Sequence, residues 1–292
     1  MKKLTTIAVM GLVGVFALSG VATAVTPAED QDWEGKIFAG SKTSSTPKKG
    51  SVGAYLHPFH KNTWPGVNTK NAEGKYNTGS VLVSPPFATA YADVFLDKNL
   101  NFNPGAFPGC SLEKVLALDP AVKGAPSSCP KESFLGSGDA AGFARAVNSP
   151  AGGYLLTPTL QDRLFASGEK NKVYLYTYSE VSKANVIVGT ISKASGKYGQ
   201  KIRFVLPKGL MLPAPGVVSQ LTSFDTTIPA KSYKGKALLT LKKCPSNKKI
   251  NTGFQNYYSN NATAKPGVNP VDGNDFVVSS NSAIINKTAK CK

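Results

Sequence analysis

The feature that most constrains the fold is an alternation of apolar and polar residues with a period of two. Residues 172–179, KVYLYTYS, and residues 201–207, KIRFVLP, each place one set of side chains on one face of an extended strand. Turn residues separate such stretches, since the chain holds 28 glycines and 20 prolines. The pattern predicts an all-β fold, a large antiparallel β-sandwich with jelly-roll or immunoglobulin-like layers. Further strands are expected at 80–83, 89–96, 186–192, 217–224, 237–243, 253–262 and 276–279.

One short helix is expected within this β pattern. SLEKVLALDP begins with Ser111, whose hydroxyl suits the N-cap of a helix, and it stops at Asp119 and Pro120. The next stretch, CPKESFLGSGDAAG at 129–142, has the glycines of a phosphate loop, but that loop needs a Lys-Ser or Lys-Thr pair after its last glycine. Read with period two, it predicts a strand with one face of very small residues, and its alanines leave a helix at 139–147 as the alternative.

The N-terminus predicts export. Two lysines, an apolar run at 7–18 and the small residues Ala22-Thr23-Ala24 make a signal peptide over residues 1–24. The run is shorter than the roughly 20 residues of a membrane span, so the expected location is extracellular or in the cell envelope. Residues 25–50, rich in Ser, Thr, Lys and Pro, predict a flexible tail. Residues 51–292 predict one β-sandwich domain, with two sub-sandwiches meeting near residue 170 as the alternative.

Four cysteines in an exported protein predict disulfides. Three pairings are open, and the pairing of sequence neighbours, Cys110 with Cys129 and Cys244 with Cys291, is favoured. His57 and His60 are the only histidines, so a metal site here would also need carboxylates. We therefore expect a polar pair at a strand end, with no metal and no other cofactor, ahead of a long loop at 62–77.

The formal charge of +17 comes almost entirely from lysine, since the chain has only three arginines. Specific nucleic-acid recognition favours the planar guanidinium group, so a nucleic-acid partner is not expected. A lysine-rich surface is typical of weak attraction to anionic polymers or of a solvated sheet edge. The lysine cluster around Cys244 is interpreted first as a solvated, salt-screened edge, with a basic patch for such polymers as the alternative; its members are Lys242, Lys243, Lys248 and Lys249.

A stripe of tyrosines on the strand at 172–179 offers a possible platform for stacking sugar rings. The favoured interpretation is that the stripe covers part of a second core or a helix, because tyrosine forms strands well and packs readily. The residues are Tyr174, Tyr176 and Tyr178.

Two sets of motifs resemble a pattern found in uncharacterised secreted proteins of actinobacteria. The first is FPGC at 107–110 followed by CPKESFLGSGDA at 129–140, and the second runs from KGKALLTLKKCP through a DG turn to Cys291. The resemblance covers about residues 80–292 and implies a β-sandwich with two local disulfides. It implies no activity, and it does not cover the insert that follows HPFH.

These observations predict a secreted or envelope-associated protein that is not an enzyme and associates weakly with anionic wall or matrix polymers. No Gly-x-Ser-x-Gly motif is present and no carboxylates cluster along the chain, so no catalytic residue is assigned. A secreted hydrolase of polysaccharides or esters is the first alternative. A cleft with two carboxylates, or a serine near His57 or His60, would favour it. A carbohydrate-binding module is the second alternative.

Overall fold

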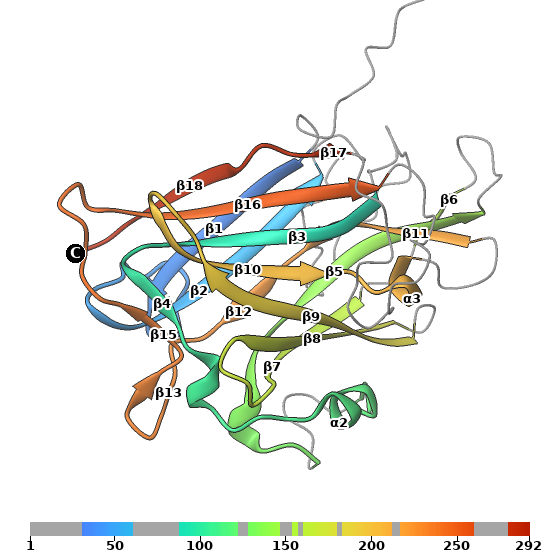
Figure 1. Cartoon of the computed structure of the whole chain (residues 1–292), viewed down its shortest axis with the longest axis horizontal. Helices are drawn as coiled ribbons and strands as arrows, with labels where there is room; N and C mark the ends of the chain where they lie inside the picture. Colours follow the sequence, from blue (N-terminus) through green and yellow to red (C-terminus); the bar gives the residue numbers. More distant parts are fainter. Residues whose placement is uncertain are drawn as a thin grey trace, which may run out of the picture.

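The structure, a computed structural model, describes residues 31–60, 88–121, 128–146, 154–156, 160–179, 183–211, 217–259 and 280–292. Within them the chain is mostly β-strand, with two short α-helices and two 3-10 turns (Figure 1). The expected signal peptide, the loop at 62–77 and the strands at 80–83 and 276–279 lie outside these residues. Among the described residues there is no helix of the length and apolarity that crossing a membrane requires.

The strands account for most of the described chain, and in sequence order they are β1 Gln31–Ala39, β2 Gly50–His60, β3 Ala88–Asp97, β4 Leu100–Phe102, β5 Phe134–Ala146, β6 Tyr154–Leu156, β7 Leu160–Ala166, β8 Lys172–Ser179, β9 Lys183–Lys193, β10 Tyr198–Val205, β11 Val217–Phe224, β12 Thr226–Ile228, β13 Ser232–Tyr233, β14 Lys236–Ala237, β15 Leu239–Leu241, β16 Lys249–Ser259, β17 Ser280–Asn281 and β18 Ile285–Lys290. The helical segments are η1 Pro104–Ala106, α2 Leu112–Leu116, η2 Lys131–Ser133 and α3 Lys208–Met211.

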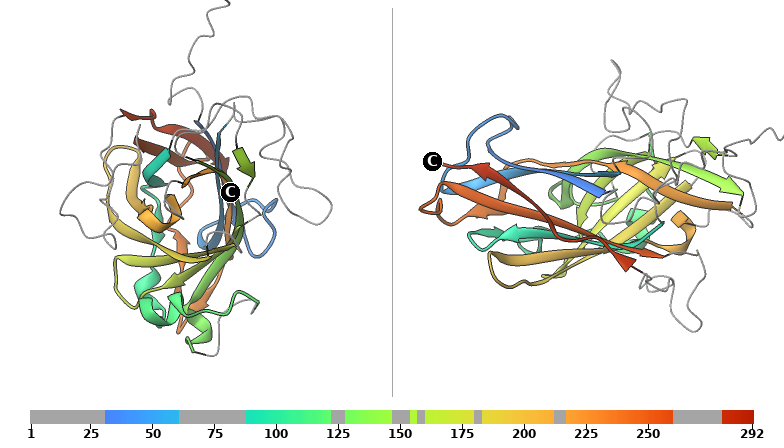
Figure 2. Two further views of the ribbon diagram at one scale, coloured as in Figure 1. Left: turned by 90° about the vertical axis from the view of Figure 1, so that its right-hand side faces the viewer. Right: turned by 90° about the horizontal axis from the view of Figure 1, so that it is seen from above.

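Sixteen of these strands form one antiparallel sheet. Its main path runs β17-β16-β3-β10-β9-β8-β7-β5-β11-β2-β15-β4, with β1, β6, β12 and β18 paired beside it. The sheet folds over so that its two halves face one another (Figure 2). Trp33 of β1 stacks on Phe254 of β16 across the interior, with ring centroids 5.4 Å apart. The predicted all-β fold is confirmed.

A single large core fills the space between the two halves of the sheet. It joins residues from the beginning of the chain to its end, from Trp33 to Cys291. The chain does not divide near residue 170, because β7 and β8 on either side of it pair from Gln161 with Tyr178 to Ala166 with Val173. A smaller second core lies under α2.

The prediction of a flexible tail over residues 25–50 is wrong, because residues 31–39 form the strand β1. β1 pairs with β2 along its whole length, from Gln31 opposite His60 to Ala39 opposite Val52. Its alternate residues Trp33 and Ile37 are buried in the main core. This period-two pattern was hidden in sequence because charged and turn-forming residues dominate the composition around it.

The stretch that begins at Cys129 forms a strand, as predicted. β5 covers residues 134–146, and its glycines allow a close approach, since a Cβ on Gly138 would overlap the backbone oxygen of Asp225. The helix α2 is also confirmed, with Ser111 at its N-cap accepting a hydrogen bond from the amide of Lys114 at 3.4 Å.

Both disulfides pair sequence neighbours, as predicted. Cys110 is bonded to Cys129 beside α2, and Cys244 is bonded to Cys291 next to the C-terminus. The amide of Cys110 also donates to the carbonyl of Ala166 at 2.9 Å, which ties the segment before α2 to β7.

Candidate functional site

Several turns meet at one end of the sandwich. The amide of Lys98, between β3 and β4, donates to the carbonyl of Lys197, between β9 and β10, at 3.0 Å. The amide of Lys242, just after β15, donates to the carbonyl of Asn99 at 2.8 Å. Three turns that are far apart in the sequence therefore form one continuous surface.

The C-terminus belongs to the same surface. The amide of Cys291 donates to the carbonyl of Lys248 at 3.0 Å, and the amide of Lys292 donates to the carbonyl of Pro47, between β1 and β2, at 3.0 Å. The disulfide from Cys291 to Cys244 adds a covalent link between the C-terminus and the turn that follows β15.

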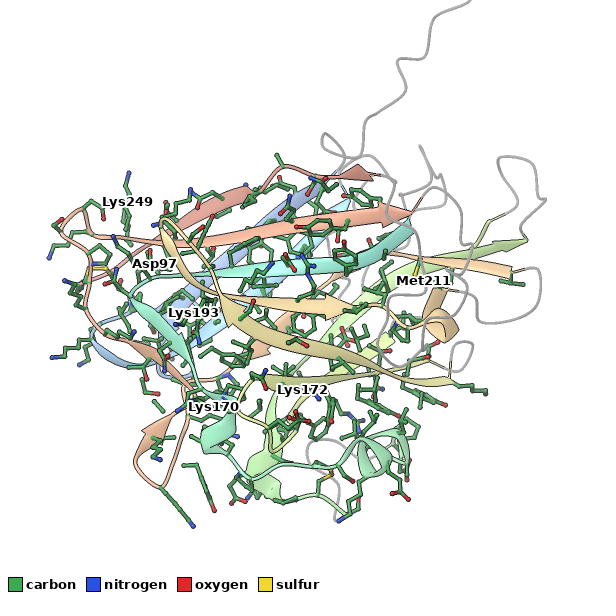
Figure 3. The ribbon with its side chains drawn as sticks, in the orientation of Figure 1. Asp97, Lys170, Lys172, Lys193, Met211 and Lys249 are labelled. Atoms are coloured by element: carbon green, nitrogen blue, oxygen red, sulfur yellow. A yellow bond between two sulfur atoms is a disulfide. The ribbon has the colours of Figure 1, made fainter. Side chains whose placement is uncertain are left out.

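We call this surface the basic end, and it is defined by exposed lysines. Figure 3 labels two of them, together with Asp97, at this end of the molecule. Asp97 is the only acidic side chain in these turns and strand ends, and it is buried, accepting hydrogen bonds from the amides of Asn99 and Asn251. The twelve lysines are Lys42, Lys48, Lys49, Lys98, Lys193, Lys197, Lys242, Lys243, Lys248, Lys249, Lys290 and Lys292.

The sequence found four of these lysines because they lie close together in the chain. The structure adds eight others by bringing five separate segments together, so the predicted patch is part of a larger one. Many like charges without counter-charges create a positive potential that attracts polyanions. Salt weakens this attraction, because at physiological ionic strength the Debye length is only about 8 Å.

The tyrosine stripe on β8 is not an exposed platform. Tyr176 is fully buried and Tyr174 is 8% exposed, and both pack in the second core under α2. Tyr178 is partly buried against the same core, and the Tyr176 hydroxyl donates to the carbonyl of Leu118 at 3.3 Å. Burial raises the pKa of Tyr174 and of Tyr176. The sugar-stacking interpretation of this stripe is therefore wrong, and the favoured interpretation, a second core, is confirmed.

His60 is the last residue of β2 and His57 lies three residues before it, so both histidines are near the strand end, as expected. The side chain of His57 is buried. Its Nε2 is 3.0 Å from the Oγ of Ser223 on β11, and its Nδ1 is 3.6 Å from Oε2 of Glu34 on β1. Burial alone would raise the pKa of Glu34, but the hydrogen bonds and charges of Lys36 and His57 outweigh that effect and hold it below its ordinary value. The serine contacts the histidine and the histidine contacts the carboxylate, which is the arrangement of the Ser-His-Asp/Glu triad in acyl-transfer enzymes.

Little of the serine and histidine of this trio is exposed, although Ser223 is among the residues that line a small cavity. Ser223 is 2% exposed and His57 is 3% exposed. Ser223 also sits within the sheet, opposite Phe59 on β2 and Ala141 on β5. A nucleophile has to reach the substrate carbonyl beside donors for the oxyanion, so the trio acts here as a polar contact between three strands.

Two other sites considered from the sequence receive no positive support. In the part of the chain that the structure describes, no group of three or more His, Cys, Asp and Glu side chains could hold a metal ion. A cavity of about 70 Å³ lies between the two halves of the sheet, and its described lining is mainly apolar, with Val94, Phe204 and Phe254 among its walls. No carboxylate is among these lining residues, so this cavity does not offer the pair that a glycosidase needs.

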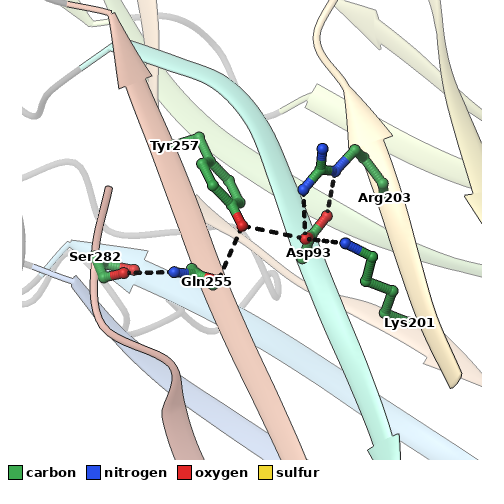
Figure 4. Close-up of polar contacts among 6 residues, drawn as sticks. All are labelled: Asp93, Lys201, Arg203, Gln255, Tyr257 and Ser282. Atoms are coloured by element: carbon green, nitrogen blue, oxygen red, sulfur yellow. Dashed lines mark hydrogen bonds and ion pairs between the residues drawn. The ribbon is translucent and has the colours of Figure 1, made fainter. Parts of the chain in front are cut away.

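A second polar cluster, which sequence reasoning missed, lies on the outer face of β16, β3 and β10 (Figure 4). Asp93 is fully buried and accepts two hydrogen bonds from Arg203, from Nε and Nη2, both at 2.7 Å. The Nζ of Lys201 lies 3.1 Å from the same carboxylate. The guanidinium carbon of Arg203 lies 4.4 Å from the ring centroid of Tyr91 and 5.0 Å from that of Tyr257.

The charges and aromatic rings of this cluster affect one another. Hydrogen bonding to Asp93 raises the pKa of Arg203, and burial together with the charge of Asp93 raises the pKa of Tyr257. The sequence places Asp93 and Arg203 on separate predicted strands, and only the register that sets them opposite each other could have revealed the pair.

No protein-family model, no curated protein and no solved structure matches the chain. The likeness to secreted actinobacterial proteins therefore stays a prediction.

Proposed function

We propose that the protein is an exported, non-enzymatic component of the cell envelope or its surroundings that binds anionic polymers of the wall or matrix. The observation that carries the proposal is the basic end. Twelve exposed lysines lie there, and the one carboxylate side chain among them, Asp97, is buried and hydrogen-bonded.

The chemistry of lysine fits a repetitive and variable partner. Each ammonium group is a hydrated point charge on a flexible stem, so it pairs with many anion geometries and selects none of them strongly. A cluster of such charges gains affinity from the number of simultaneous contacts, and that affinity falls as salt screens them.

The proposal is tested by retention of the purified protein on immobilised polyanions, such as teichoic acid or polygalacturonate. The variant replaces Lys242, Lys243, Lys248 and Lys249 with glutamine. We expect it to elute at clearly lower salt than the wild-type protein. Its matched control carries the same four changes at exposed lysines elsewhere, at Lys114, Lys131, Lys170 and Lys183.

The control has the same net charge as the variant, so it separates a local surface from a general charge effect. We expect the control to elute close to the wild-type protein. Equal loss of retention in both would show diffuse attraction without a basic end. No retention of the wild-type protein at low salt would overturn the proposal.

A secreted hydrolase is the second candidate, and the observation in its favour is the trio of Glu34, His57 and Ser223. It would require a conformation that exposes Ser223, which is buried here. Labelling with a fluorophosphonate probe tests this directly. Labelling of the wild-type protein that disappears in Ser223→Ala would support the hydrolase, and absence of labelling would remove it.

A further inference from the structure

The outer face of β9, β10, β3 and β16 carries polar and aromatic side chains in rows across the strands. The central row consists of Thr190, Arg203, Asp93 and Gln255, each opposite the next in register. Tyr91 and Tyr257 form the neighbouring row toward one end, and their ring centroids lie 4.4 Å apart. The face therefore combines cations, an amide and aromatic rings within one patch.

Arg203 is held rigidly, but its hydrogen-bonding capacity is not used up. Asp93 accepts hydrogen bonds from Nε and Nη2, and the two tyrosine rings lie side by side next to the guanidinium group. The third nitrogen, Nη1, has no hydrogen-bond partner among the described residues, and the side chain is 34% exposed. A pre-ordered guanidinium with a free edge is well suited to bind a carboxylate.

The charge of the cluster also favours an anion. One buried carboxylate, Asp93, faces two cations, Arg203 and Lys201, so one positive charge remains. Lys201 is 28% exposed and lies beside Arg203 on the side nearer the basic end. An incoming anion therefore meets a positive and partly desolvated surface.

The two tyrosines add aromatic surface to this patch, which a site for phosphate alone would not need. Tyr257 and Tyr91 are half-buried, and the hydroxyl of Tyr257 lies 3.0 Å from Oε1 of Gln255. A tyrosine presents a large apolar ring with a polar tip and loses little side-chain entropy on binding. This combination suits a ring that is apolar on its face and polar at its edge, as a sugar is.

The patch and the basic end lie along the same strands. Lys197 precedes β10, and Arg203 is six residues further on, which is about 20 Å of extended strand. A linear polymer bound at the basic end can therefore continue along β10 to Arg203.

We propose that this outer face binds acidic polysaccharide, with the carboxylate of a uronic acid on Arg203 and Lys201 and a sugar ring against Tyr257. The inference rests on the proposed function and deepens it, because it selects a carboxylated glycan from among the anionic polymers. Tyr257 and Arg203 are binding residues here, and the basic end adds affinity that does not depend on the sugar.

The test compares binding of oligogalacturonate, inorganic polyphosphate and neutral dextran by isothermal calorimetry. Arg203→Lys keeps the positive charge but loses the planar guanidinium group that can bind a carboxylate with two hydrogen bonds. Tyr257→Leu removes the aromatic ring. We expect each to weaken oligogalacturonate binding by about tenfold or more and to leave polyphosphate binding unchanged. Tyr233→Leu, which makes the same change on β13 and away from this face, serves as the matched control and should bind like the wild-type protein. Dextran should not bind, and thermal melts establish that each variant is folded.

The outcomes separate this inference from the proposed function. Unchanged oligogalacturonate binding in Arg203→Lys and Tyr257→Leu, together with weaker binding in the four-lysine variant, would overturn the sugar site and keep the basic end. If the wild-type protein binds polyphosphate but not oligogalacturonate, the sugar site is likewise overturned and the basic end is kept. If neither polyanion binds, the proposed function itself fails.

Discussion

The disulfide between Cys244 and Cys291 links the stability of the fold to the basic end. It joins residues 47 apart in the sequence, and in the chain-entropy model a loop of that length is worth about 4 kcal/mol. The disulfide between Cys110 and Cys129 spans 19 residues and is worth about 3 kcal/mol by the same relation. The two bonds therefore stabilise the fold by similar amounts, but only one of them lies at the basic end.

Replacing Cys244 and Cys291 with serine should lower the free energy of unfolding by about 2 to 4 kcal/mol, measured by urea denaturation. It should also weaken binding to polyanions under conditions where the protein stays folded. The reason is that the disulfide and the hydrogen bond from Cys291 to Lys248 hold Lys290 and Lys292 in place. Without the bond, the final residues can fray away from the surface.

The matched control replaces Cys110 and Cys129 with serine. It should lose about as much stability while keeping wild-type affinity for polyanions, because that disulfide ties the segment before α2 to the rest of the fold. Equal affinity in both double variants would refute the claim that the C-terminal lysines belong to the binding surface. A loss below 1 kcal/mol in the first variant would refute the stability estimate.

Three further predictions address the fold and its charges. Gly138→Ala should lower the free energy of unfolding by at least about 2 kcal/mol in denaturation experiments, because its Cβ would overlap Asp225. Gly209→Ala, whose Cβ would lie 3.1 Å from Asn185 Oδ1, should lower it by less than about 1 kcal/mol. Ser111→Ala should cost about 0.5 to 1 kcal/mol by removing the N-cap of α2, and a loss of 3 kcal/mol would contradict a role limited to capping. Because the pKa of Glu34 is lowered in the folded state, its ionised form stabilises the fold above the ordinary value of 4.5, and that contribution is lost as the pH falls. Glu34→Gln should therefore lose less stability than the wild-type protein between about pH 5 and pH 3, and parallel pH profiles would show that Glu34 contributes nothing.

Much of the fold was predictable because local patterns carry it. The alternation at 172–179 and 217–224, the N-cap at Ser111 and the two disulfides each depend on residues close together in the sequence. β1 was missed because its few apolar positions lie in a polar segment, and their burial depends on a partner, β16, more than 200 residues away.

The candidate sites were less predictable for the same reason. Lys242, Lys243, Lys248 and Lys249 could be grouped from sequence, but the other lysines of the basic end come from four additional segments that only the sheet brings together. The sequence favoured a core over a platform for the tyrosines of β8, but it could not show that α2 packs over them.

The most direct test of the basic end is the dependence of polyanion affinity on salt. The logarithm of the association constant should fall linearly with the logarithm of the salt concentration, with a slope of about −0.7 to −0.9 for each ionic contact when the polymer is as highly charged as a nucleic acid. We predict that replacing Lys242, Lys243, Lys248 and Lys249 with glutamine makes this slope less steep by about 3, whereas the control with Lys114, Lys131, Lys170 and Lys183 replaced keeps the wild-type slope. The same slope in all three proteins would contradict the account.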